Sequence, residues 1–107
     1  QLFADGGRAN GSQILDPSWI RFSTTPTPQS PDGRFAAHWW VKLNEDIGGG
    51  PAGWSRIAPD AFFAVGHEAQ TLTVIPSKRL VVVRLGASIH IDAWNQAQFI
   101  ADVQDAV

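Results

Sequence analysis

The chain has 107 residues, a formal net charge of −2 and a hydrophobic content of 44%. A chain of this length forms one small domain or part of a larger one, and its apolar content excludes disorder throughout. The small net charge gives no attraction to nucleic acid or to an anionic membrane, and the longest apolar runs have the length of a strand rather than of a membrane-spanning helix. Without cysteine the chain forms neither disulfides nor thiolate metal sites, which leaves its compartment open.

The beginning of the chain predicts two short helical pieces separated by a turn. Gln1–Asp5 followed by Gly6-Gly7 is typical of the last turn of a helix with a glycine stop, and we expect the rest of that helix to lie upstream. Asn10-Gly11 predicts a tight turn. Asp16 is a favourable N-cap and the proline after it a favourable first helical residue, so a second helix is expected to begin there.

The middle of the chain predicts an antiparallel sheet of about four strands. Strands are expected near residues 36–43, 62–67, 70–75 and 80–85, because these segments are rich in β-branched and aromatic residues and are bounded by Gly or Pro. The last two strands are expected to form a hairpin whose turn is Pro76–Arg79. The glycine-rich connection before the second strand lacks the Lys-Ser/Thr pair of a phosphate-binding loop and predicts a long loop only.

The end of the chain predicts a helix that packs on this sheet, which makes the fold class α+β. Asp92 is the expected N-cap, and the helix is expected to run to Val107. Apolar residues recur along it at helical spacing: Ala93, Trp94, Ala97, Ile100, Ala101, Val103 and Val107. The all-apolar strand 80–83 also needs cover on its other face, and the chain offers no second layer for it. We therefore expect a partner domain.

The order of these elements resembles one family of enzymes. The segment from Phe62 to Gly86 resembles the last core hairpin of the serine β-lactamase-like hydrolases, which include β-lactamases, penicillin-binding DD-peptidases, family VIII-type esterases and nylon-oligomer hydrolases. Phe62-Phe63-Ala64-x-Gly66-x-x-x-Gln70 is most similar to the esterase and nylon-oligomer-hydrolase branch, and Trp39-Trp40-Val41 resembles the aromatic edge of the family's sheet. The resemblance implies that residues 1–107 are the C-terminal part of a β-lactamase/transpeptidase-like α/β sandwich.

The resemblance also implies a site. In these enzymes an inner edge strand carries the third active-site motif, and a backbone N–H there completes the oxyanion hole that stabilises the acyl-transfer intermediate. By position, Gly66, His67 and Glu68 would line the substrate, a small amide or ester, and the N–H of His67 would be the oxyanion donor. Ala69 stands where the branch often has glycine, and no lysine follows the motif. No cofactor is implied.

The chain lacks the residues that carry out the chemistry in this family. It contains no tyrosine and no Ser-x-x-Lys. We therefore expect the nucleophile in a missing N-terminal part of the same polypeptide, and expect the chain alone to be inactive. The alternative is a non-catalytic small α+β domain, or a remnant of one, that binds a partner. An upstream reading frame that carries Ser-x-x-Lys and Tyr-x-Asn would distinguish the two.

The remaining polar residues predict structural roles. His38 is expected within a strand and His90 on the surface, and without the resemblance His67 would be read as a solvated residue at a strand end. A metal site made by these three histidines is not expected, because their spacing fits no ligand pattern. Ser77 has no base near it in sequence and is expected to be a turn residue rather than a nucleophile.

Overall fold

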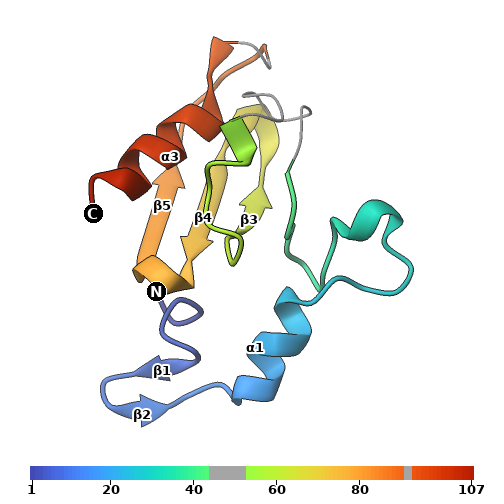
Figure 1. Ribbon diagram of the computed structural model, residues 1–107, viewed down its shortest axis with the longest axis vertical. Coiled ribbons are helices and arrows are strands. Elements are labelled where there is room, and N and C mark those ends of the chain that lie inside the picture. The colour runs from blue at the N-terminus through green and yellow to red at the C-terminus, as the bar shows by residue number, and fades with distance from the viewer. Residues whose placement is uncertain (44–52, 91–92) are drawn as a thin grey trace.

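The computed structural model describes residues 1–43, 53–90 and 93–107, and its fold is α+β, as predicted (Figure 1). The glycine run Gly48-Gly49-Gly50 and the expected N-cap Asp92 lie outside the described residues. The strands and helices are β1 (Arg8–Ala9), β2 (Ser12–Gln13), α1 (Pro17–Thr24), β3 (Phe62–Val65), β4 (Thr71–Ile75), β5 (Leu80–Arg84) and α3 (Gln96–Asp105). In the described parts of the chain, no helix is long and apolar enough to cross a membrane.

The central element is a three-stranded antiparallel sheet in the order β3-β4-β5. The predicted hairpin is confirmed, since Thr71 pairs with Arg84 at one end and Ile75 with Leu80 at the other. Its turn begins with Pro76, whose ring suits the first position of a helical turn, and ends at Arg79 in the left-handed conformation, with φ of 50°. The β-branched residues of both strands favour this pleated arrangement.

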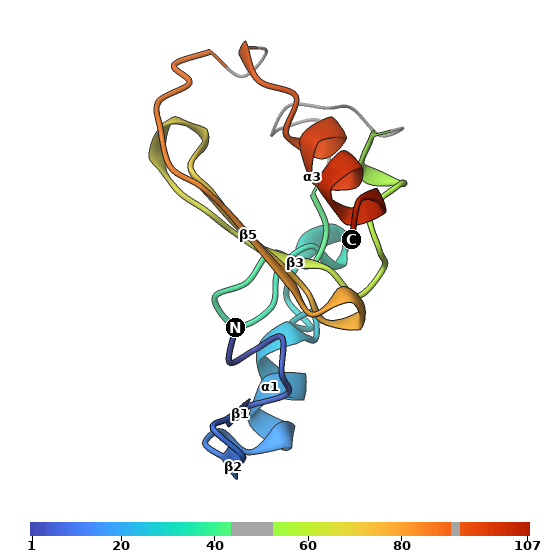
Figure 2. The same cartoon turned by 90° about the vertical axis from the view of Figure 1, so that its left-hand side faces the viewer.

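The core lies on both faces of this sheet, because successive side chains of a strand point to opposite faces. Phe63 and Ile75 lie on the face that α3 covers (Figure 2), in a cluster completed by Ile57, Ala61, Ile100 and Ala101. Phe62 and Val74 lie on the other face, where Ala4, Phe3 and Trp39 pack against them. That second face is covered only in part, since Val83 remains 56% exposed and Leu85, just beyond β5, 79% exposed.

Two buried glutamines attach α3 to the rest of the fold at its two ends. Near its N-terminus, Gln96 donates from Nε2 to Thr71 Oγ1 on β4 at 2.6 Å. Near its C-terminus, Gln104 accepts from the Ala58 N–H at 2.8 Å and donates to the Arg56 carbonyl at 3.2 Å. Because both side chains are buried and satisfied, they fix the position of the helix along the sheet as well as its covered face.

The C-terminal helix is shorter than the sequence predicts. It begins at Gln96 and ends at Asp105, so Ala93 and Trp94 precede it and Val107 follows it. Asn95 is its N-cap, with a side-chain oxygen that accepts from the Gln98 N–H at 2.9 Å. The predicted start was wrong because asparagine is as good a cap as aspartate, and the later cap is the one the fold uses.

Residues 36–43 do not form the strand that the sequence predicts. The chain reverses at His38, whose φ of 66° is left-handed, so that Phe35 pairs with Trp40. Trp40 then forms two backbone hydrogen bonds with Phe63 on the free edge of β3, at 2.7 and 2.9 Å. The prediction failed because a strand cannot continue through a left-handed residue. The sheet therefore has three regular strands, and in the described part of the chain one bridging residue extends it.

The N-terminal part packs on the sheet through Phe3 and Ala4, and its elements β1, β2 and α1 lie at the lower end of Figure 1. The predicted glycine stop is confirmed. The N–H of Gly7 donates to the Leu2 carbonyl at 2.9 Å and that of Gly6 to Phe3 at 3.3 Å, which is the Schellman pattern, although only one helical turn precedes it. Asn10 and Gly11 both have positive φ, as a two-residue turn between β1 and β2 requires.

The helix predicted at Asp16 is also confirmed. A carboxylate oxygen of Asp16 accepts from the Ser18 N–H at 2.7 Å. Hydrogen bonding from Ser18, first from its side chain and then from this N–H, lowers the pKa of the Asp16 carboxyl below its ordinary value. The helix that follows, α1, stands away from the sheet in both views (Figures 1 and 2). It carries two exposed aromatic side chains in contact, Trp19 and Phe22.

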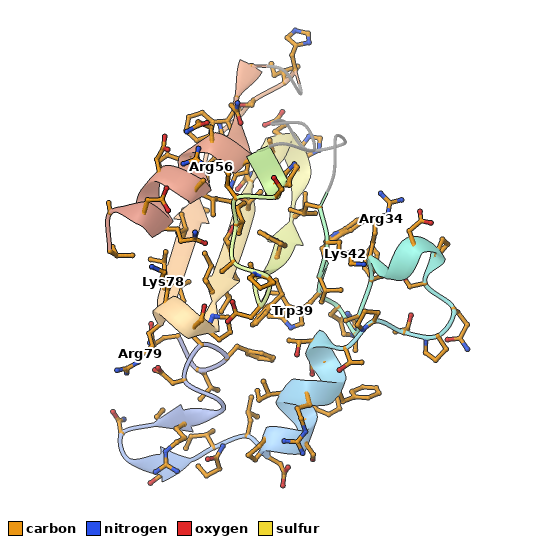
Figure 3. The ribbon with its side chains drawn as sticks, in the orientation of Figure 1. Arg34, Trp39, Lys42, Arg56, Lys78 and Arg79 are labelled. Atoms are coloured by element: carbon orange, nitrogen blue, oxygen red, sulfur yellow. The ribbon has the colours of Figure 1, made fainter. Side chains whose placement is uncertain are left out.

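One exposed ion pair connects the N-terminal turn to the β4–β5 turn. Arg79, labelled at the lower end of the sheet in Figure 3, donates from Nε to Asp5 at 3.1 Å. The pKa of Asp5 is lowered, first by the hydrogen bond that Gln1 donates to it and then by Arg79. Ion pairs this exposed contribute little to stability. The pair therefore adds little to the packing of Phe3 and Ala4, which places this segment on the sheet.

Candidate functional site

The predicted site residues lie in the β3–β4 turn, not on the edge strand itself. β3 ends at Val65, two residues earlier than the sequence predicts. Residues 67–69 form a tight turn, which the Gln70 N–H closes by donating to the His67 carbonyl at 3.2 Å, and the Gly66 N–H donates to the Gln70 carbonyl at 2.8 Å. The strand was predicted too long because Glu68 and Ala69 are left-handed, with φ of 55° and 60°, and together reverse the chain.

The turn continues the free edge of β3. Phe63 directs its N–H and carbonyl away from β4, toward Trp40. Along a strand, the backbone N–H and carbonyl groups of successive residues point alternately to the two edges, so those of Val65 also point away from β4. One step further, the N–H of His67 donates to no residue within the described ranges. The structure therefore brings Gly66, His67 and Glu68 together at the end of an edge strand, with a backbone donor that the rest of the described chain does not use.

The side chain of His67 points into solvent. It is 89% exposed, and its Nε2 lies 3.6 Å from a carboxylate oxygen of Glu68. His38 lies in the reversal before Trp39, and His90 is exposed beyond β5, so the three histidines do not meet. Within residues 1–43, 53–90 and 93–107, no three His, Asp or Glu side chains gather closely enough to hold a metal ion.

Ser77, expected as a turn residue, has an acidic partner. Its hydroxyl donates to one carboxylate oxygen of Asp60 at 2.9 Å, and its N–H donates to the other at 2.7 Å. A carboxylate that accepts both bonds caps the start of the turn after β4. With no histidine in this contact, the pair lacks the base that activates a serine, which agrees with the structural role that the sequence predicts.

Comparison of the chain with family models, with curated proteins and with solved structures found no match.

The β3–β4 turn is held by three residues that the sequence interpretation did not single out, Arg84, Ser88 and Trp94, here called the Arg84 cluster. The guanidinium of Arg84 donates to the Ala69 carbonyl at 2.7 Å and to the Ser88 hydroxyl at 2.6 Å. It lies over the ring of Trp94, 4.7 Å from the ring centroid. The Ser88 N–H donates to the Glu68 carbonyl at 3.0 Å. The carbonyl of Ala69 thus accepts a hydrogen bond from the last residue of β5, and that of Glu68 accepts one from the segment after β5.

These hydrogen bonds offset a local strain. A residue with a Cβ costs roughly 1–2 kcal/mol in the left-handed conformation, so Glu68 and Ala69 together store roughly 2–4 kcal/mol. Net contributions of about 1–3 kcal/mol per hydrogen bond, the larger for bonds from a charged donor, are of the same size. The turn therefore keeps its shape because the neighbouring segment binds it, and not because its own sequence favours that shape.

A weak signal for the Arg84 cluster is present in the sequence. Arg84 ends the apolar run of β5, and by strand alternation its side chain shares a face with Leu80 and Val82, which is the face that α3 covers. A charged residue on a covered face needs partners. The sequence does not identify these partners, because they lie in segments that meet only in the folded chain; they are Ala69, Ser88 and Trp94.

Proposed function

We propose that this chain is the C-terminal segment of a serine hydrolase that acts on small amides or esters by acyl transfer, and that the β3–β4 turn forms one wall of its active site. The observation that supports this most directly is the His67 amide. It lies at the end of an edge strand and has no acceptor in the described parts of the chain. A preorganised backbone donor is what an oxyanion hole requires, since a tetrahedral intermediate develops negative charge on one oxygen.

Gly66 and Glu68 complete the proposed substrate wall. Gly66 has no side chain to exclude a substrate from the strand end, and Glu68 carries the only carboxylate of this turn. The enzyme family that the chain resembles often has glycine where this chain has Ala69. Ala69 has a left-handed φ, which is the conformation that favours glycine, so the backbone here is compatible with the family pattern. The family pattern and the backbone conformation therefore agree at this position, although the residue differs.

The partner is a part of the polypeptide that would carry Ser-x-x-Lys and a tyrosine. Exposed apolar surface supports such a partner: Val83 and Leu85 continue the partly covered face of the sheet, and Trp19 and Phe22 lie on α1. Large exposed apolar side chains that gather on one face are a frequent feature of interfaces. The same surface would serve the alternative, a non-catalytic α+β domain, so the upstream reading frame and an activity measurement are needed to separate the two.

The first experiment compares the chain alone with a polypeptide extended upstream in the same reading frame. We expect no saturable hydrolysis of p-nitrophenyl butyrate or a chromogenic cephalosporin by residues 1–107, because no activated nucleophile is present. The extended polypeptide should carry Ser-x-x-Lys, hydrolyse one of the substrates and lose activity when that serine is changed. An upstream frame without these motifs, or a start codon directly before Gln1, would support the binding domain.

The second experiment tests the His67 amide. His67→Pro removes the N–H and should fold, because Gly66 at φ −113° and ψ −174° is already in the extended conformation that a residue before proline prefers. Turnover should fall by roughly a hundredfold or more. His67→Ala is the matched control, and it should keep most of the activity because the donor is backbone. Full turnover by a folded proline variant would exclude this amide as the oxyanion donor.

A further inference from the structure

The geometry of the β3–β4 turn depends on contacts from outside it. Glu68 and Ala69 are consecutive left-handed residues, and neither is glycine. The Glu68 carbonyl accepts from the Ser88 N–H at 3.0 Å, and the Ala69 carbonyl accepts from Arg84 at 2.7 Å. Figure 2 shows the turn beside the segment that follows β5.

The Arg84 guanidinium is itself held on several sides. Ser88 accepts from its second nitrogen at 2.6 Å, and the Trp94 ring lies under it at 4.7 Å. Trp94 donates its indole N–H to Gln96, which in turn donates to Thr71 at 2.6 Å, one residue beyond the turn. The guanidinium is thus fixed to β4 and to the start of α3, both of which belong to the packed part of the fold. Arginine suits this place because its planar, permanently charged fork can bond two acceptors and stack on a ring at once.

We propose that Arg84 is a positioning residue of the candidate active site: it holds the β3–β4 turn in its left-handed conformation and thereby orients the His67 amide. The catalytic part of this inference rests on the proposed function, whereas the structural part does not. Arg84 does not touch the substrate. It acts through the carbonyl of Ala69, two residues after the donor.

The structural part is tested on the 107-residue chain by amide hydrogen exchange and ¹H–¹⁵N chemical shifts. In Arg84→Gln, exchange of the Gln70 and Ser88 amides should rise by roughly tenfold or more, and the shifts of residues 66–70 should move, while the amides inside β4 exchange as before. The β4 amides report whether the variant is folded. Arg84→Lys keeps the charge but lacks the planar fork that directs two N–H groups to the two acceptors, so it should give an intermediate result. It also covers the case in which the glutamine variant does not fold.

Arg56→Gln is the matched control. Arg56, labelled in Figure 3, is an arginine with two acidic partners on α3, Asp102 at 3.4 Å and Asp105 at 3.0 Å, and neither partner belongs to the turn. It should leave the amides of residues 66–70 unchanged. Unchanged exchange and shifts at 66–70 in a folded Arg84→Gln or Arg84→Lys chain would overturn the inference, whatever the activity of the longer polypeptide.

The catalytic part is tested in the polypeptide that carries the nucleophile. Arg84→Gln should lower kcat by roughly 10- to 100-fold with little change in KM, because a misplaced oxyanion donor affects the transition state more than substrate binding. Arg84→Lys should recover part of this loss, and Arg56→Gln should lose nothing. A normal kcat together with a loosened turn would overturn the positioning role. If the unmodified polypeptide hydrolyses nothing, the proposed function fails and the catalytic part fails with it, while the exchange measurement still decides whether Arg84 holds the turn.

Discussion

Ala69→Gly should stabilise the chain, although it removes a methyl group from a half-buried position. The φ of Ala69 is 60°, and a Cβ in this conformation meets the following carbonyl oxygen. Glycine has no Cβ, so it adopts the same conformation without that contact. Arg84 donates to the backbone carbonyl of residue 69, so the glycine variant retains this hydrogen bond.

The expected size follows from three opposing contributions. Relief of the left-handed conformation contributes roughly 1–2 kcal/mol. The greater backbone freedom of glycine in the unfolded chain costs about 0.5–1 kcal/mol, and loss of a partly buried methyl costs at most about 0.5 kcal/mol. The net stabilisation is therefore about 0.5 kcal/mol, which raises the Tm of a domain of this size by roughly 2–4 °C.

The assay is thermal and urea unfolding, with Ala87→Gly as the matched control. Ala87 is exposed in the segment after β5 and does not have a positive φ, so it has no strain to lose. Ala87→Gly should lower the free energy of unfolding by about 0.5–1 kcal/mol, only because glycine gives the unfolded chain more backbone freedom. If Ala69→Gly lowers the Tm as much as Ala87→Gly does, the turn is not strained at residue 69, and the argument that the Arg84 cluster offsets strain there is refuted.

Three further predictions follow from the fold. Ile100 on α3 is completely buried, so Ile100→Ala should lower the free energy of unfolding by about 2–5 kcal/mol in urea titrations, and a loss below 1 kcal/mol would contradict the packing described. The folded pKa of Asp16 lies below its unfolded value because Ser18 hydrogen-bonds the carboxylate, so its contribution to stability is present above the ordinary carboxyl pKa and disappears as the pH falls through the folded pKa. Asp16→Asn keeps a capping oxygen and should remove that part of the pH dependence, whereas an unshifted Asp16 pKa by NMR titration would disprove it. The chain alone should bind the dye ANS at neutral pH through the exposed surface around Val83 and Leu85, and Val83→Thr should reduce the signal; absence of binding together with a sharp, high Tm would count against an uncovered interface.

Features set by neighbouring residues could be predicted from the sequence. The glycine stop at Gly6, the turn at Asn10-Gly11 and the cap at Asp16 each depend on contacts within a few residues, and all three are present. The β4–β5 hairpin belongs to the same class, because β-branched residues on both sides of a proline turn favour one pairing locally. The place of Gly66, His67 and Glu68 at the end of β3 was predicted in outline, but as a strand rather than a turn.

Features that need distant parts of the chain could not be predicted in this way. The aromatic run 36–43 has strand propensity, yet the chain reverses at His38, where Phe35 pairs with Trp40 and Trp40 bonds the distant edge of β3. β3 ends early because Arg84 and Ser88 hold two left-handed residues that no local preference would select. The helix begins at Gln96, after the Asn95 cap, in the place where Gln96 and Gln104 also meet partners more than twenty residues away. Propensity and capping therefore determined the short elements, whereas long-range hydrogen bonds and packing decided where β3 ends, which of the possible caps starts α3 and which backbone N–H the edge presents.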